Sequence, residues 1–307
     1  MDSDSDFYGD EETVSVLKDR VNDFDVVGWW HRQNNMTDNY PKPSIKREQQ
    51  TQHTISAPVN NTRIKPLYDP HQDAPGARRP SETIPDFLSR LPPSTSDWEP
   101  GFEWIWIANP YHPPPELEPA LAQFRHAAEE RLGLFAEFEK MATLTAGRNT
   151  GVTVKALAAL RQDVAKERRE TVSDLRELAD ACNVVTGKWM LFPPPGEVDA
   201  VWACVAAATA EGELGTAAKV ETRSRADKER LVCVYTKDCR EKEDVARVLI
   251  QMRELGLVKP GGKQIYYKSD AWTELGIYGG NKWGIGASMY SSNEIFGYTK
   301  LVVSRRA

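Results

Sequence analysis

The fold is decided by four short runs, which read GKWMLF at 187–192, AKVETR at 218–223, LVCVYTKD at 231–238 and IYYKSD at 265–270. Runs rich in β-branched and aromatic residues are typical of strands. An alanine-rich apolar segment, 198–211, follows the first run, and segment 241–255 follows the third with apolar residues at helical spacing. The order strand-helix-strand-strand-helix-strand predicts an α+β fold, in which helices cover one face of a mainly antiparallel sheet.

The same reasoning extends the sheet in both directions along the chain. We expect strands at 102–108, 188–192, 216–223, 231–237, 264–268, 286–290 and 298–303. The segments 116–144 and 153–182 carry apolar stripes opposite dense charge, with a glycine-containing break between them. They are expected to form an antiparallel helical hairpin, which interrupts the sheet as an insertion at 116–182.

The N-terminal part of the chain has a different composition. Residues 1–12 form an acidic tail, and 11–33 show weak helical periodicity. Residues 34–80 are rich in polar residues and proline, and contain too few large apolar side chains to offset the entropy cost of ordering. We therefore expect a tail, a short helix and a disordered linker at 1–81, followed by the folded domain at 82–307.

Charge and composition limit the function classes. The net charge of -6 and the pI near 5.6 argue against a basic field over the whole molecule, although a local cationic site remains compatible with them. The sequence shows neither a leader peptide nor an apolar run long enough for a membrane span. The four cysteines form no C-x-x-C pair, so we expect reduced thiols, no metal site, no cofactor, and a cytoplasmic or nuclear location.

The four runs, with LGL at 255–257, resemble the second half of the cap-binding translation initiation factor 4E. More closely, the chain resembles the basophilic-leukaemia-expressed protein family, a relative of that fold, over about residues 84–305, and the segment DAWTELGIYGGNKWG at 270–284 is among the most specific motifs of this resemblance. The resemblance implies a curved sheet of the initiation factor 4E type. It also implies a binding protein for a phosphate-bearing ligand, either a nucleotide or RNA.

The resemblance suggests which residues would hold such a ligand. The positions that match the cap-phosphate cations are Arg223 and Arg230, with Arg225 and Lys228 in the turn between them. Guanidinium groups form strong charge-assisted bonds to phosphate, so these residues and Lys219 are candidate ligands. The alternative is that the turn is merely a solvated hairpin connection.

Stacking aromatic residues are harder to assign. The hairpin occupies the stretch where the family of cap-binding factors carries its second stacking tryptophan, and Tyr111 and His112 fall near the first. Trp189, Trp202, Trp104 and Trp106 are assigned to the core. The remaining candidates, Trp272 and Trp283, lie in a loop rich in glycine and polar residues and are equally compatible with a site or with loop packing.

Two other function classes stay open. The C-terminal stretch bears a resemblance to bacterial phosphothreonine lyases, which would place a lysine base at Lys268 and an active-site tyrosine at Tyr290. Those enzymes also use a histidine acid, and all five histidines lie before residue 127. We therefore expect binding rather than catalysis. The third possibility is a non-catalytic scaffold for a protein partner.

Overall fold

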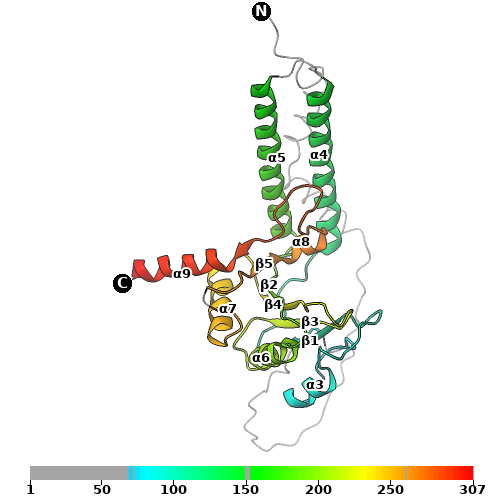
Figure 1. Cartoon of the computed structure of the whole chain (residues 1–307), viewed down its shortest axis with the longest axis vertical. Helices are drawn as coiled ribbons and strands as arrows, with labels where there is room; N and C mark the ends of the chain where they lie inside the picture. Colours follow the sequence, from blue (N-terminus) through cyan, green and yellow to red (C-terminus); the bar gives the residue numbers. More distant parts are fainter. Residues whose placement is uncertain (1–68, 72, 149–152, 260, 307) are drawn as a thin grey trace, which may run out of the picture. The chain divides into compact units, whose positions relative to one another are not determined.

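A computed structural model describes residues 69–71, 73–148, 153–259 and 261–306, and the expected acidic tail, short helix and linker up to residue 68 lie outside these ranges. The elements appear in Figure 1. The helices are α3 (Ile84–Arg90), α4 (Leu121–Arg148), α5 (Val154–Ala181), α6 (Val198–Ala210), α7 (Lys242–Glu254), α8 (Asp270–Glu274) and α9 (Ser292–Arg306). The strands are β1 (Trp104–Ala108), β2 (Gly187–Leu191), β3 (Ala217–Glu221), β4 (Val232–Thr236), β5 (Tyr266–Ser269) and β6 (Tyr290–Ser291).

The strands form one curved, unclosed sheet in the order β1-β3-β4-β2-β5-β6, and every neighbouring pair is antiparallel. The central register sets Trp189 opposite Val234 on one side and opposite Tyr267 on the other. These three side chains therefore point to the same face. The α+β class, the antiparallel sheet and its helical layer are confirmed.

One face of the sheet holds the hydrophobic core. Helices α6 and α7 pack on it, and their apolar residues join those of the strands in one buried cluster. Trp189 and Trp202 are fully buried there, as expected. The indole N–H of Trp189 donates to the backbone carbonyl of Val245 at 3.0 Å, which satisfies its only polar group and ties β2 to α7.

The assignment of Trp104 and Trp106 to the core is wrong. The fully or almost fully buried residues of β1 are Ile105 and Ile107, which belong to the core cluster. Because side chains alternate along a strand, the two tryptophans lie on the opposite face and are only partly buried.

The C-terminal strand expected at 298–303 is also wrong, because those residues belong to α9. Ser291 and Glu294 form a reciprocal cap at the start of this helix. The Ser291 backbone N–H donates to Glu294 Oε2 at 2.7 Å, and the Glu294 N–H donates to Ser291 Oγ at 3.3 Å. This capping box favours a helix over the β-branched residues that follow. The strand expected at 286–290 is reduced to β6.

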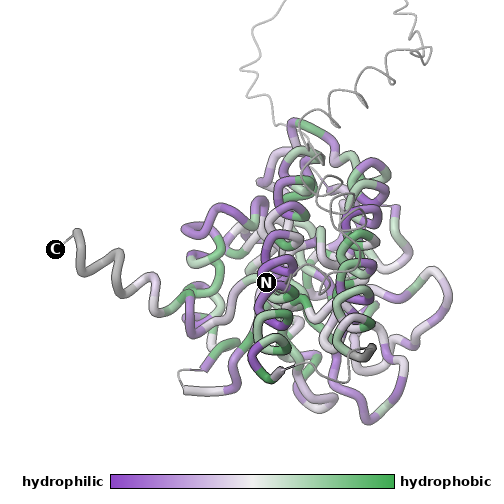
Figure 2. The backbone as a smooth tube through the Cα atoms, turned by 90° about the horizontal axis from the view of Figure 1, so that it is seen from above, coloured by the Kyte–Doolittle hydropathy of each residue, from purple (hydrophilic) through white to green (hydrophobic). Residues whose placement is uncertain are grey.

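The helical hairpin is present as α4 and α5, which lie side by side (Figure 1). Hydrophilic and hydrophobic positions alternate along both helices, as Figure 2 shows, in agreement with an amphipathic pair. Between them, the buried Arg131 donates to Glu167 Oε1 at 2.8 Å and to Asp174 Oδ2 at 2.6 Å. Arg168 joins the hairpin to the C-terminal loop by donating to the Trp283 carbonyl at 2.8 Å.

The packed part of the chain begins earlier than the expected boundary at residue 82. Ala77 forms a parallel bridge with Trp106, and the Trp106 N–H donates to the Gly76 carbonyl at 3.0 Å. This segment covers the outer edge of β1, which would otherwise present unpaired backbone groups. The compact unit accordingly includes described residues well before residue 82.

The contact between Gly76 and β1 can be tested by one added methyl group. A Cβ at Gly76 would overlap the backbone carbonyl of Trp104, whereas a Cβ at Gly133 within α4 would meet nothing within 4 Å. We expect Gly76→Ala to lower the free energy of unfolding by about 1–3 kcal/mol. Gly133→Ala should raise it by about 0.5–1 kcal/mol. Urea unfolding measures both, and equal stability of the Gly76 variant and wild type would contradict the packed edge.

The core role of Trp189 gives a second test. Because this side chain is fully buried, Trp189→Ala should cost about 3–5 kcal/mol of unfolding free energy. The matched control is Trp98→Ala, because Trp98 is 46% exposed and should change stability little. Similar midpoints for the two variants in urea unfolding would show that Trp189 is not a core residue.

Candidate functional site

The face of the sheet opposite the core carries a row of lysines. The register places Lys188 directly beside Tyr235 on β4 and Lys268 on β5, and places Lys219 on β3 one pleat away. Each lysine alternates with core residues of its own strand, so all three point away from α6 and α7. We call this surface the lysine face, defined by Lys188, Lys219, Lys268, Tyr235, Trp104 and Trp106.

Lys188 lies at the centre of the lysine face and is only 5% exposed. Its ammonium group bonds to Asp270 Oδ1 and donates to Thr273 Oγ1 at 2.9 Å. The Asp270 carboxylate is held from the other side by the Thr186 hydroxyl at 2.6 Å. The ammonium group also lies 5.4 Å from the ring centre of Tyr235. Lys188 is thus a fixed, paired cation.

Lys219 lies among aromatic rings. Its Nζ is 3.9 Å from the ring centre of Trp104, 4.7 Å from that of Trp106 and 5.7 Å from that of Tyr235. His71 stacks on Trp106 with ring centres 4.0 Å apart. Burial lowers the pKa of Lys219, and the nearby Lys188 lowers it further. Cation–π contacts partly replace the water that this ammonium group has lost.

Lys268 is 4% exposed, and its Nζ lies 3.8 Å from the ring centre of Tyr278. Burial lowers the pKa of Lys268 to about 8, with a further contribution from the like charge of Lys188. Burial also raises the pKa of the Cys233 thiol, which lies opposite Lys219 in the register, to about 11, so this group stays neutral and supplies no charge.

The charges on the lysine face do not balance. Within the described ranges, Asp270 is the only carboxylate that bonds to any of the three ammonium groups, and it bonds to Lys188. Glu221 also lies on this side of β3, but its carboxylate is engaged by Lys228 at 2.7 Å. Burying an ammonium group without an anionic partner costs folding free energy. A bound anion would therefore be stabilised at the lysine face.

The turn cations named from the sequence lie elsewhere. Arg223 pairs with Asp97 at 2.8 Å, which raises the pKa of the guanidinium, and Lys228 pairs with Glu221. Arg225 pairs with Asp227 at 3.2 Å. Arg230 is 1% exposed and donates to the Lys228 carbonyl. Arg223, Arg225 and Lys228 are thus ion-paired within the chain, whereas the buried Nε of Arg230 has no hydrogen-bond partner among the described residues. None of the four belongs to the lysine face.

Lys268 and Tyr290 do not converge. The Tyr290 ring packs 5.8 Å from the ring of Tyr267, on the core side of β5, and its hydroxyl donates to the Cys239 carbonyl at 3.3 Å. Lys268 follows Tyr267 in the strand and points to the other face. A base and a tyrosine on opposite faces of a sheet cannot act on one bond, so the arrangement expected for a lyase is not formed.

The loop tryptophans separate as well. Trp272 is buried, donates its indole N–H to the Gly286 carbonyl at 3.0 Å, and lines a cavity beside α5. The Trp283 ring lies 4.7 Å from Lys282 Nζ. Neither is part of the lysine face. Tyr111 is exposed, and His112 is partly buried in the loop after β1, which leaves no tryptophan sandwich of the cap-binding type at that position.

Sequence reasoning found Lys219 and Lys268 but missed Lys188, Tyr235 and His71. A detectable signal existed, because Lys188 and Lys219 each stand between non-polar residues inside a short strand, and Lys268 follows two tyrosines in another. Period-2 alternation would have grouped them on one face. His71 could not be found in this way, since it reaches Trp106 from a segment read as linker. His71 stacks on Trp106 of β1, and β1 is four strand spacings from β5, which carries Lys268, or roughly 19 Å at the usual spacing.

Neither a metal-binding cluster nor a membrane-spanning helix occurs among the described residues. No three histidine, cysteine, aspartate or glutamate side chains there gather in an arrangement that could hold a metal ion. No helix within those ranges combines the length and the apolar character that crossing a bilayer requires.

The comparison with protein families fits the resemblance noted in the sequence. The matching family is described as basophilic leukemia-expressed protein Bles03, and its match covers residues 17–276, which include all of the sheet except β6. The matched residues also contain all six residues of the lysine face. Because the match covers well over half of the chain, the chain belongs to the Bles03 family.

Proposed function

We propose that the lysine face binds a phosphate-bearing ligand of the nucleotide class. The observation that carries the proposal is the charge imbalance, because three ammonium groups share one carboxylate in a largely desolvated place. A phosphate would supply the missing negative charge and form charge-assisted hydrogen bonds with Lys219 and Lys268. Asp270 would keep Lys188 in position while the other two ammonium groups contact the ligand.

The layout of the row favours a ligand with several phosphates. Lys219 and Lys268 stand on β3 and β5, which are three strand spacings apart, or about 14 Å between backbones. A single phosphate would contact one end of this row, whereas a chain of two or three phosphates could follow it. We therefore favour a nucleoside di- or triphosphate, or the 5′ end of an RNA that carries such a chain.

The aromatic end of the lysine face supports the nucleotide class. Trp104, Trp106 and His71 lie around Lys219, at the β1 side of the row. Aromatic faces contribute roughly 1–3 kcal/mol per stacked base. We infer that the base lies toward β1 and the phosphates toward β5. With its four free cysteines, the protein would act in the cytoplasm or nucleus.

The first test is calorimetric titration with ATP, GTP and inorganic tripolyphosphate. The double variant Lys219→Gln/Lys268→Gln should weaken nucleoside triphosphate binding at least tenfold, because each lost charged hydrogen bond costs about 1.5–3 kcal/mol. Binding by wild type should also weaken from pH 7 to pH 9, because Lys268 loses its proton near pH 8. The affinity should fall with added salt.

The control is the double variant Arg223→Gln/Lys228→Gln, which removes two ion-paired cations of the turn. It should bind like wild type. If the turn variant loses binding and the lysine variant keeps it, the site lies at the turn instead. An absence of binding by wild type to all three compounds would overturn the proposal and favour a protein-interaction scaffold.

The destabilisation of the fold by the buried charge of Lys268 can be measured without any ligand. The unfolded chain holds the Lys268 proton up to its usual pKa of 10.5, whereas the folded protein releases it near pH 8. The charged lysine therefore destabilises the fold fully below pH 8, and this effect disappears as the pH rises to about 10.5. Lys268→Met should raise the unfolding free energy by about 2 kcal/mol at pH 7.

The measurement is urea unfolding at pH 7 and pH 10. If Lys268 instead stabilises the fold, Lys268→Met will lower the unfolding free energy at pH 7. Lys155→Met is the matched control, because Lys155 is exposed on α5 and should leave stability unchanged at both pH values. If Lys268→Met stabilises the fold and also removes ligand binding, Lys268 serves binding at the expense of stability.

A further inference from the structure

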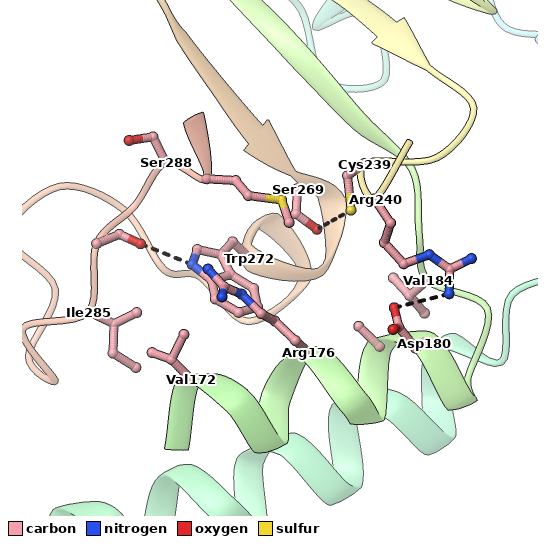
Figure 3. A pocket seen from close by; sticks show the side chains of 13 residues that line it. Val172, Arg176, Asp180, Val184, Cys239, Arg240, Ser269, Trp272, Ile285 and Ser288 are labelled. Carbon is pink, nitrogen blue, oxygen red and sulfur yellow. Dashed lines mark hydrogen bonds and ion pairs between the residues drawn. The ribbon is translucent and has the colours of Figure 1, made fainter. Parts of the chain in front are cut away.

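A cavity of about 220 Å³ lies between α5 and the C-terminal loop, away from the lysine face. Its walls come from α5, from the 239–240 turn, from the end of β5 with α8, and from the loop before β6, as Figure 3 shows. The apolar lining residues are Val172, Ala179, Val184, Trp272, Ile285 and Met289. The polar lining residues include Arg176, Asp180, Arg240, Ser269 and Ser288.

The walls of this cavity are fixed by bonds across it. The indole N–H of Trp272 donates to the Gly286 carbonyl at 3.0 Å, which holds the ring against the loop. Ser269 Oγ accepts from the Ala271 N–H at 3.2 Å and lies 3.9 Å from the Cys239 thiol. Protein interiors contain few voids of this size, so a preformed cavity with rigid, mainly apolar walls is suited to a ligand.

The two arginines at the cavity differ in their partners. Arg240 is neutralised by Asp238 at 2.6 Å and by Asp180 at 3.4 Å. For Arg176, by contrast, the described residues provide neither an ion pair nor a hydrogen bond, and Figure 3 shows its side chain extending from α5 among the lining residues of the cavity. Arg176 is therefore the cation at this cavity that can accept an external anion.

The remaining polar groups restrict the ligand further. The Cys239 thiol is neutral, because burial raises its pKa to about 11, so it serves as a wall rather than a nucleophile. The Asp180 carboxylate is occupied by Arg240. One unpaired guanidinium beside an apolar chamber suits a molecule with one anionic end and one apolar body. Planar carboxylates fit the guanidinium fork in a bidentate manner.

We propose that this cavity binds a small monocarboxylic acid with an apolar or aromatic body, with Arg176 as the counter-ion of the carboxylate. The body of the ligand lies between Val172, Trp272 and Ile285. Because these walls belong to α5 on one side and to the α8–β6 segment on the other, the ligand bridges the helical hairpin and the sheet. The cavity shares no lining residue with the lysine face.

The test compares 3-phenylpropanoate with 3-phenylpropanamide, which has nearly the same shape without the charge, by calorimetric titration of the full chain. Wild type should bind the acid at least tenfold more tightly than the amide, a difference of about 1.4 kcal/mol. Arg176→Met should reduce this ratio to about one and leave the affinity for the amide unchanged. Arg169→Met, an exposed arginine two turns away on the same helix that does not line the cavity, should retain the wild-type ratio.

A second variant tests the apolar walls. Val172→Phe fills the chamber and should abolish binding of both compounds, provided that its unfolding transition remains cooperative. If this variant does not fold, the comparison of acid and amide in wild type and Arg176→Met still decides the matter. Three results would overturn the inference: binding of neither compound to wild type, equal binding of acid and amide, or an acid preference that persists in Arg176→Met.

Discussion

The register of β2 against β4 and β5 is the constraint on which the rest of the structure depends. Trp189 must face the core, because it fills the space under α7 and its indole N–H finds an acceptor only there. Since side chains alternate, Lys188 is then forced onto the opposite face, beside Tyr235 and Lys268. A slip of one residue would bury the lysines against α6 and α7. The packing of the core thus determines which side chains form the lysine face.

Much of the fold was predictable because its elements are locally consistent. The alanine-rich run of α6 and the spaced apolar residues of α7 each specify a helix without help from distant residues. The misassigned C-terminal segment shows where local reasoning fails, because its β-branched residues favour a strand. The Ser291–Glu294 capping box starts a helix there and overrides that preference. In β1, the alternation of side chains separates the tryptophans from the isoleucines, but it does not indicate which pair faces the core.

The candidate site was less predictable than the fold. The partner that neutralises Arg223 is remote in sequence. Arg223 pairs with Asp97 across more than a hundred residues, and no local pattern indicates such a contact. The lysine face has the same origin, because its charge imbalance emerges only when three strands are brought into register. Sequence shows which residues could carry charge, whereas the fold decides which of those charges stay unpaired.

The buried Arg131 has a consequence for the hairpin as a mechanical part. Its guanidinium contacts Glu167 and Asp174, which stand two turns apart on α5, so one side chain clamps two points along the facing helix. If α4 slid along α5 by a turn, at least one of these bonds would break and leave charge stranded inside the pair, which is strongly disfavoured. The two helices therefore cannot shear past one another. Over its described residues, the hairpin therefore moves as one stiff unit rather than as two sliding helices.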